Sequence, residues 1–208
     1  MTTPVAAGSA AVLGFWFGEP GADGLMDAGR RQTLFRADPA FDTQIRERFG
    51  ADVEAALRGD RDDWSANAHG RLALILLLDQ FTRNIHRGDA RAFAGDERAL
   101  TLARIGVECA DDRLLTVDER AFFYLPFEHS ENIADQDTCV ALLEGLLAEQ
   151  RPGSPSARVV ASYLDHAHEH RQLIRQFGRF PHRNAVLGRK DTEAEAAWRQ
   201  RDRRRFGQ

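Results

Sequence analysis

The chain has 208 residues, of which 43% are hydrophobic and 29% charged, and these proportions are ordinary for a folded protein. The formal net charge of −4 excludes the clearly basic surface that a nucleic-acid-binding domain needs. The longest apolar run covers residues 72–78, far fewer than the roughly 20 of a membrane span, and residues 1–8 show no signal-peptide pattern. We therefore expect a soluble, cytoplasmic protein with one helical domain over residues 1–208.

Helix start and stop signals recur along the chain, whereas the alternating runs typical of strands do not occur. Asp38 followed by Pro39 is typical of a helix N-terminus. Thr116 with Glu119 predicts a capping box, and Gly178 predicts a helix end. These signals indicate an all-α stack of about seven to eight antiparallel helices. The expected helices run from Pro39 to about Leu57, from Trp64 to His86, from Asp96 to about Cys109, onward from Thr116, from Gln136 to Glu149, from Ser156 to Phe177, and onward from Thr192.

The helix expected over residues 64–86 carries a first block of polar residues in apolar sequence. At about 100° per residue, apolar side chains occupy both faces in the first half of residues 72–86, so this half should be buried. Asp79 and Arg83 follow at the i, i+4 spacing of an ion pair, and Asn84 comes next. The pair is either a structural contact or part of a ligand pocket, since a buried ion pair is seldom favourable for stability alone.

A second block lies within residues 124–132. Pro126 interrupts a helical pattern there and predicts a kink. His129 and Glu131 follow it, and two such groups can carry out acid–base chemistry if both reach one cavity. The alternative is that His129 is a core histidine with satisfied hydrogen bonds.

The third block is an irregular loop near the C-terminus that is dense in arginine, histidine and asparagine. Its arginines at 179, 183 and 189 are suited to holding an anion, next to His182 and Asn184. The alternative is that these arginines cap helix carbonyls and pair with the many carboxylates of the chain.

Two patterns indicate redox or metal chemistry only weakly. Cys109 and Cys139 do not make a disulfide framework, and their apolar helical surroundings predict buried free thiols. His166, Glu169 and His170 match the H-x-x-E-H zinc pattern, but the stretch is rich in histidine and no third-ligand motif accompanies it. Glycine-rich phosphate loops do not occur either. We therefore expect no metal and no cofactor.

Four distinctive stretches stand in order along the chain: VLGFWFG at 12–18, LDQFTRNI at 78–85, FYLPFEHSE at 123–131, and HR at 170–171 through RFPHRN at 179–184 to LGR at 187–189. They resemble the motifs of the bacterial domain-of-unknown-function family 924 over nearly the whole chain. That family usually has proline at the position of Thr82 and an aromatic-rich stretch at residues 24–35. The resemblance implies a tetratricopeptide-like all-α fold and no particular reaction, and its motifs coincide with the three polar blocks.

Two hypotheses for function follow. The leading one is a pocket for a small anionic or polar metabolite, in which Arg83 and Arg183 hold the anion and His129 or Glu131 transfers a proton. The alternative is a helical scaffold that binds a peptide or protein partner in a concave groove. A closed pocket of a few hundred Å³ would favour the first, and an open groove the second. A third reading is that all three blocks serve only packing.

No nucleic acid or membrane is expected as a partner, and a homodimer is compatible with either function. The candidate site residues are His129 and Glu131 as catalytic groups, and Asp79, Arg83, Asn84, His182, Arg183 and Asn184 as ligand-binding groups.

Overall fold

A computed structural model describes residues 7–201, and every regular element within that range is helical. This confirms the expected all-α stack. Single turns of 3-10 helix occupy several of the connections, at Asp62–Ala66, Ala90–Phe93, Asp111–Leu114 and Pro181–Arg183. The helices are α1 (Ala7–Phe17), α2 (Ala28–Leu34), α3 (Pro39–Arg58), α4 (Ala68–Ile75), α5 (Thr82–Ile85), α6 (Asp96–Glu108), α7 (Val117–His129), α8 (Ile133–Ala148), α9 (Pro155–Phe177) and α10 (Glu193–Arg201).

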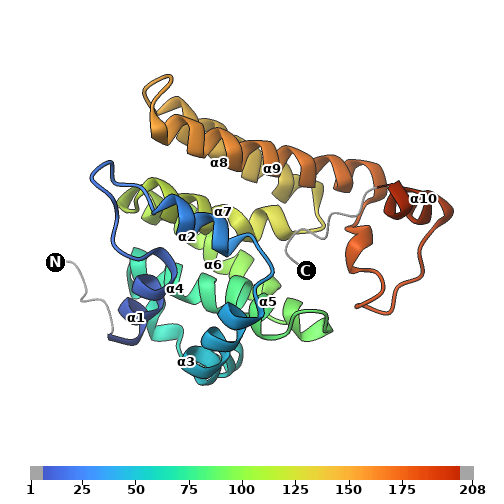
Figure 1. Cartoon of the computed structure of the whole chain (residues 1–208), viewed down its shortest axis with the longest axis horizontal. Coiled ribbons are helices and arrows are strands. Elements are labelled where there is room, and N and C mark those ends of the chain that lie inside the picture. The colour runs from blue at the N-terminus through green and yellow to red at the C-terminus, as the bar shows by residue number, and fades with distance from the viewer. Residues whose placement is uncertain (1–6, 202–208) are drawn as a thin grey trace.

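The longest helix, α9, pairs with α8 along one edge of the molecule (Figure 1). The two are antiparallel, because only residues 149–154 separate the end of α8 from the start of α9. Helix α7 packs against both, and α1, α3, α4 and α5 lie on its other side. Helix α10 lies beyond the far end of α9. The tetratricopeptide-like geometry of the helix pairs stays a prediction.

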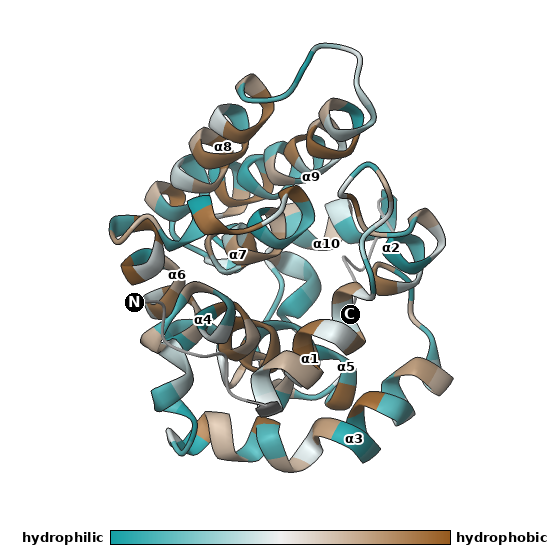
Figure 2. Ribbon diagram, turned by 90° about the vertical axis from the view of Figure 1, so that its left-hand side faces the viewer, coloured by the Kyte–Doolittle hydropathy of each residue, from teal (hydrophilic) through white to brown (hydrophobic). Residues whose placement is uncertain are grey.

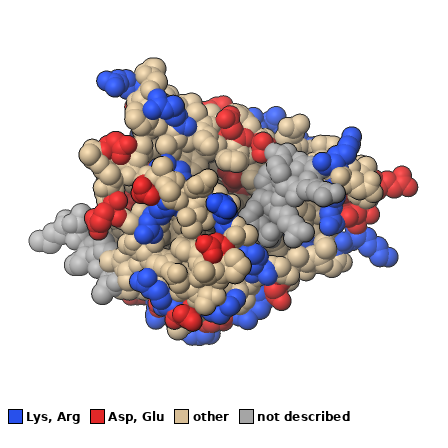
Figure 3. All heavy atoms as spheres, in the orientation of Figure 1, with Lys and Arg blue, Asp and Glu red and all other residues tan. Residues whose placement is uncertain are grey.

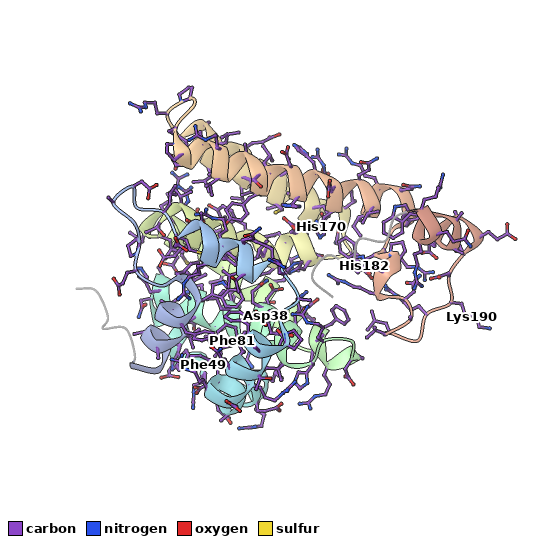
Figure 4. The ribbon with its side chains drawn as sticks, viewed as in Figure 1. Asp38, Phe49, Phe81, His170, His182 and Lys190 are labelled. Carbon is purple, nitrogen blue, oxygen red and sulfur yellow. The ribbon has the colours of Figure 1, made fainter. Side chains whose placement is uncertain are left out.

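The hydrophobic core is built where α1, α3, α4 and α7 meet, and large aromatic rings fill it. Trp16 is fully buried, and its ring centroid lies 5.2 Å from that of Phe81 and 5.7 Å from that of Phe122. Phe49 of α3 reaches Phe81 at 5.2 Å (Figure 4). Figure 2 shows hydrophobic faces of α4 and α7 in the middle of the molecule and hydrophilic residues in the loops at its margin.

Several helix ends lie where the capping signals predict them. The side chain of Asp38 accepts two backbone N–H bonds in the first turn of α3. Thr116 and Glu119 form the capping box of α7. Helix α9 ends at Gly178, whose φ of +69° is the left-handed conformation that favours glycine. Local sequence therefore determines these boundaries.

Two helices begin earlier than expected. Helix α8 starts at Ile133, because the side chain of Asn132 caps its first turn. Helix α9 starts at Pro155 and is capped by Ser154 rather than Ser156, with proline at its first position. Proline suits that position because its missing N–H would be unpaired there in any case.

The single helix expected over residues 64–86 is wrong. Trp64 belongs to a separate 3-10 turn, and Asn67 caps a new helix, α4, by accepting a bond from the backbone N–H of Gly70 at 2.9 Å. The chain then widens into a π-helical segment, Leu76–Phe81, before α5 completes it. In that wider turn the hydroxyl of Thr82 donates to the carbonyl of Leu78 at 2.7 Å. A prediction that assumes one constant helical period along the whole stretch misses this change of pitch.

The cysteines follow the expectation in part. Cys139 is a buried free thiol, but Cys109 is exposed. The expectation for Cys109 was wrong because this residue caps the C-terminus of α6, where the backbone leaves the core. Within residues 7–201, the helices are all too short or too polar to cross a membrane.

Candidate functional site

A cavity of about 390 Å³ opens between α2, α5, α7 and α9. The chain segment after α2 contributes Arg36, and the segment from the π-helical turn through α5 contributes Arg83. Helix α7 contributes Glu128 and His129, and α9 contributes a row that includes His170. Four separate stretches of sequence thus bring cations, carboxyl groups and imidazoles to one space.

A buried aspartate and a histidine join the π-helical segment to α7. Asp79 is fully buried, and its carboxylate lies 2.7 Å from Nδ1 of His129. Burial alone would raise the pKa of Asp79, but the charge of Arg83 and hydrogen bonds from His129 and Gln80 hold this pKa well below its usual range. An ionised carboxylate only accepts hydrogen bonds, so Nδ1 of His129 must carry the hydrogen and donate it.

The same tautomer determines what His129 offers to the cavity. Burial lowers the pKa of His129, although Asp79 acts in the opposite direction. The ring is therefore neutral near pH 7, and its Nε2 is left without a proton. His129 lines the cavity, so this arrangement supplies a base there, oriented by a buried carboxylate.

Arg83 connects Asp79 to a second carboxylate. Its guanidinium lies 3.1 Å from the carboxylate of Asp79, which confirms the pair expected from the i, i+4 spacing. It also donates two hydrogen bonds, of 2.9 and 3.0 Å, to Asp96 at the start of α6. The buried Nε of Arg83 finds no hydrogen-bond partner within residues 7–201. Other atoms of Arg83 line the cavity, whereas this nitrogen is enclosed by the protein.

Glu128 is a buried carboxyl group with a strongly raised pKa. One of its oxygens lies 3.1 Å from Nδ1 of His170, which is also 2.9 Å from the carbonyl oxygen of His166. Burial, followed by the charges of Asp79 and Glu169, raises the pKa of Glu128 to about 8. At neutral pH this carboxyl group is therefore mostly protonated, and it can donate a proton inside the cavity.

Two further arginines line the cavity, and they differ in their ion pairing. Arg87 is held by Asp42, with N–H···O distances of 2.8 and 3.0 Å, and Asn84 donates to the same carboxylate at 2.7 Å. Arg36 is exposed, and its guanidinium pairs with no carboxylate within residues 7–201. Arg36 is thus a cation at the cavity wall that no described side chain neutralises.

The structure brings half of the predicted site residues together. Arg83, Asn84 and His129 line the cavity, and Asp79 lies directly behind them. Arg183 is one step further away: its guanidinium lies 3.6 Å from Asp96, the carboxylate that Arg83 also binds.

Arg183 packs against aromatic rings and is not among the residues that line the cavity. Its guanidinium carbon lies 4.8 Å from the ring centroid of Phe93 and 4.5 Å from that of Phe180. Burial and the neighbouring Arg83 lower the pKa of Arg183 to about 10. The residue therefore packs the C-terminal loop against the helices.

Glu131 binds the C-terminal loop and is not among the residues that line the cavity. Its carboxylate accepts bonds of 2.7 and 2.9 Å from Arg189, and one of 2.8 Å from the backbone N–H of Phe180. Burial opposes ionisation, but these bonds and the charge of Arg189 lower the pKa of Glu131. An ionised, fully hydrogen-bonded carboxylate of this kind is suited to anchoring the loop.

His182 and Asn184 also belong to the loop. The ring centroid of His182 lies 5.4 Å from that of Phe180, and Figure 4 shows His182 in the loop beyond His170. Burial, with Arg183 next, lowers the pKa of His182 to about 3. Asn184 donates to Asp191 at 2.8 Å. Neither residue lines the cavity.

Sequence reasoning missed several cavity residues. Arg36, Glu128, Glu169 and His170 line the cavity but were not proposed for the site. A signal existed for α9, because the H-x-x-E-H spacing places its three polar residues on one helix face, but the pattern was considered only for zinc. Among residues 7–201, no group of three or more suitable side chains could hold a metal ion.

Outside the cavity the surface is mixed in charge. Figure 3 shows basic and acidic side chains interspersed over the face that it presents. This distribution agrees with the small net charge of −4.

Comparison with known proteins relates this arrangement to a family. Residues 12–202 match the family described as "Bacterial protein of unknown function (DUF924)". A solved structure of a protein of unknown function from Agrobacterium tumefaciens is 36% identical, with a TM-score of 0.80, and the match covers 96% of this chain and 100% of that one. No curated protein matches the sequence. The resemblance predicted from the four motifs is confirmed, and the chain belongs to the bacterial DUF924 family.

Proposed function

We propose that this protein binds a small anionic metabolite in the cavity and transfers a proton to or from it. The observation that carries the proposal is the presence of two groups in opposite protonation states in one cavity. His129, oriented by Asp79 at 2.7 Å, offers an unprotonated Nε2 and acts as the base. Glu128, buried and protonated, acts as the acid. Environments that separate two titratable groups in this way are typical of acid–base sites.

The arginines support the anionic character of the ligand. Arg36 lines the cavity, is exposed, and lacks a carboxylate partner within residues 7–201. The cavity volume of about 390 Å³ falls within the range of roughly 300–1,000 Å³ that small-molecule sites occupy. This volume favours a small ligand over a peptide in a groove.

In this proposal Glu131 and Arg183, the sequence-based candidates for proton transfer and anion binding, have a supporting role. Both fix the C-terminal loop, Glu131 through Arg189 and Arg183 through its stacking on Phe180. The proton donor moves to Glu128, and the exposed anion contact moves to Arg36.

The binding step can be tested by calorimetry with acetate, succinate, citrate and inorganic phosphate. We expect Arg36→Gln to weaken binding of the best probe at least tenfold without unfolding the protein, because Arg36 is exposed. Arg58→Gln is the matched control: it removes the same charge from an exposed arginine at the end of α3, away from the cavity. Equal loss of affinity in both variants would show that only overall charge matters and would contradict the proposal.

The proton-transfer step can be tested in deuterated water by following exchange of the C–H groups next to the carbonyl of 2-oxo acids by NMR. We expect exchange that falls at least a hundredfold in His129→Gln and in Glu128→Gln, while binding persists. Exchange at the same rate in wild type and both variants would remove the catalytic part of the proposal and leave a binding protein.

A further inference from the structure

The cavity has two ends, which are set by the register of α7 against α9. The ring centroids of Phe122 in α7 and Tyr163 in α9 lie 6.3 Å apart. Six residues further along α7, Glu128 lies 3.1 Å from His170, which is seven residues further along α9. The two helices therefore run in the same direction, and residues that come earlier in both lie at one end of the cavity.

The end that the earlier residues form is apolar. Leu125 and Tyr163 line it, and they precede Glu128 and His170 by about 4.5 and 10 Å of helix rise. Phe35 also lines the cavity, and its ring centroid lies 6.1 Å from that of Tyr163, so it belongs to this end. The acid–base groups thus lie at the opposite, polar end of the same space.

Phe35 offers an aromatic surface at the apolar end. Its side chain is 47% exposed. Its ring stacks on that of Phe122 at 5.8 Å and on that of His166 at 6.4 Å, which fixes its orientation. An aromatic ring that is supported by the protein and left half exposed in a cavity is suited to packing against the aromatic ring of a ligand.

The charges around Phe35 favour the cavity over the second hollow that this residue borders. That hollow has more carboxylates than arginines in its wall, with Glu19, Asp23 and Asp27 against Arg31 and Arg158. The cavity has more arginines than carboxyl groups, with Arg36, Arg83 and Arg87 against Glu128 and Glu169. An anion is therefore favoured on the cavity side of Phe35, and the whole ligand belongs there.

We propose that the ligand is an aryl-substituted carboxylic acid whose ring packs on Phe35 and whose carboxylate lies beside Arg36. Its reacting group then points toward the polar end, where His129 and Glu128 lie. This inference rests on the proposed function, since it assumes that the cavity holds an anion. It adds the class of ligand and assigns Phe35 as the residue that determines specificity for the aryl group.

Calorimetry with acetate, phenylacetate and cyclohexylacetate tests the inference. In the wild type we expect phenylacetate to bind at least tenfold more tightly than acetate, because the phenyl group buries apolar surface against Phe35. Phe35→Ala should lose most of this gain and keep acetate binding. Phe35→Leu keeps an apolar wall but removes the ring, so it should lower the ratio of phenylacetate affinity to cyclohexylacetate affinity by about two- to tenfold.

Phe177→Leu is the matched control, because Phe177 is a partly buried phenylalanine at the end of α9 that does not line the cavity. It should keep the wild-type affinities for all three acids. If phenylacetate binds no more tightly than acetate, or if either Phe35 variant keeps the wild-type ratios, the inference is overturned while acetate binding still supports the proposed function. If no carboxylate binds, or if Arg36→Gln binds these acids as tightly as the wild type, the proposed function fails as well.

Discussion

The contacts of Asp79 with Arg83 and with His129 differ in how well the sequence alone predicts them. Its contact with Arg83 follows from helical spacing alone, because residues four apart share a helix face. Its 2.7 Å contact with His129 spans 50 positions of sequence. No local pattern specifies that contact, because it depends on how α7 packs against the π-helical segment.

Tertiary packing also decides which of two neighbouring carboxyl groups, Glu128 or Glu131, lies in the cavity. Glu128 and Glu131 are three residues apart in one polar block, and sequence reasoning chose Glu131 as the partner of His129. The structure shows Glu128 in the cavity and Glu131 bound to Arg189. What separates them is the end of α7 at His129, beyond which Glu131 turns toward the C-terminal loop.

The raised pKa of Glu128 gives a test by pH. Its pKa is about 8 in the folded state, against the ordinary value of 4.5 that we expect when the chain is unfolded. Between these values the folded protein holds a proton that the unfolded chain has lost, so Glu128 makes the free energy of unfolding fall as pH rises. This contribution is complete below pH 4.5 and is lost on passing pH 8.

We expect Glu128→Gln to remove that slope, which is at most about 1.4 kcal/mol per pH unit. Urea unfolding of wild type and variant at intervals from pH 5 to pH 8 should show a difference in stability that moves steadily in favour of the variant. Glu144→Gln makes the same change at an exposed position of α8 and should follow the wild type. Parallel curves for wild type and Glu128→Gln would mean that the buried carboxyl group is ionised in the folded state.

At the scale of elements, the close contact between α6 and the π-helical segment determines where Asp96 lies. Gly95 comes directly before α6, and a Cβ atom added to it would lie 2.3 Å from the carbonyl oxygen of Leu78. Its φ of −97° is open to any residue, so glycine is needed there for space and not for conformation. The absent side chain allows Asp96 to reach Arg83.

We expect Gly95→Ala to push the start of α6 away from Leu78 and to lower the free energy of unfolding by about 1–3 kcal/mol. Gly145→Ala is the control, since Gly145 lies within α8 and a Cβ there meets nothing within 4 Å. That variant should be more stable by about 0.5–1 kcal/mol, because alanine favours a helix. Urea denaturation measures both, and a stabilised Gly95→Ala variant would refute the steric argument.

Sequence reasoning succeeded with elements where a side chain caps a helix. Asp38, Thr116 and Gly178 mark helix ends that the structure confirms. It failed between residues 64 and 86, where apolar side chains occupy both faces and no single period is selected. The π-helical turn there is stabilised by contacts with α3 and α6, which lie far apart in the sequence.

Among residues 7–201, the buried hydrophobic side chains form one large cluster and one small one. The large cluster includes side chains from α1 through α9. The small one consists of Leu173, Ile174 and Phe180, with Phe177 and Trp198 packed against it, and it is the apolar contact of α10. Otherwise α10 is held by polar contacts such as those between Arg179 and Glu195, at 2.6 and 2.7 Å. These features predict that α10 opens separately from the rest.

Native-state hydrogen exchange measures this difference. We expect the amides of α10 to exchange at least a hundredfold faster than those of α4 and α7, because the latter are protected by the large cluster. Trp198→Ala should accelerate exchange in α10 and leave α4 and α7 unchanged. Equal exchange rates in α7 and α10 would show that the two clusters unfold as one unit.

The π-helical segment has a consequence for how relatives of this protein should be read. A π turn holds an extra residue, and each residue of a helix turns the chain by about 100°. A relative that lacked one residue between positions 76 and 81 could keep an unbroken helix and an apolar interior. Because the wide turn absorbs the extra residue, the helix on either side would keep its phase, and only the side chains within the turn would change direction. Asp79 lies within the turn and Arg83 beyond it, so a one-residue gap at this place in an alignment would predict the loss of the Asp79–His129 contact in that relative, with the helix around Arg83 unchanged.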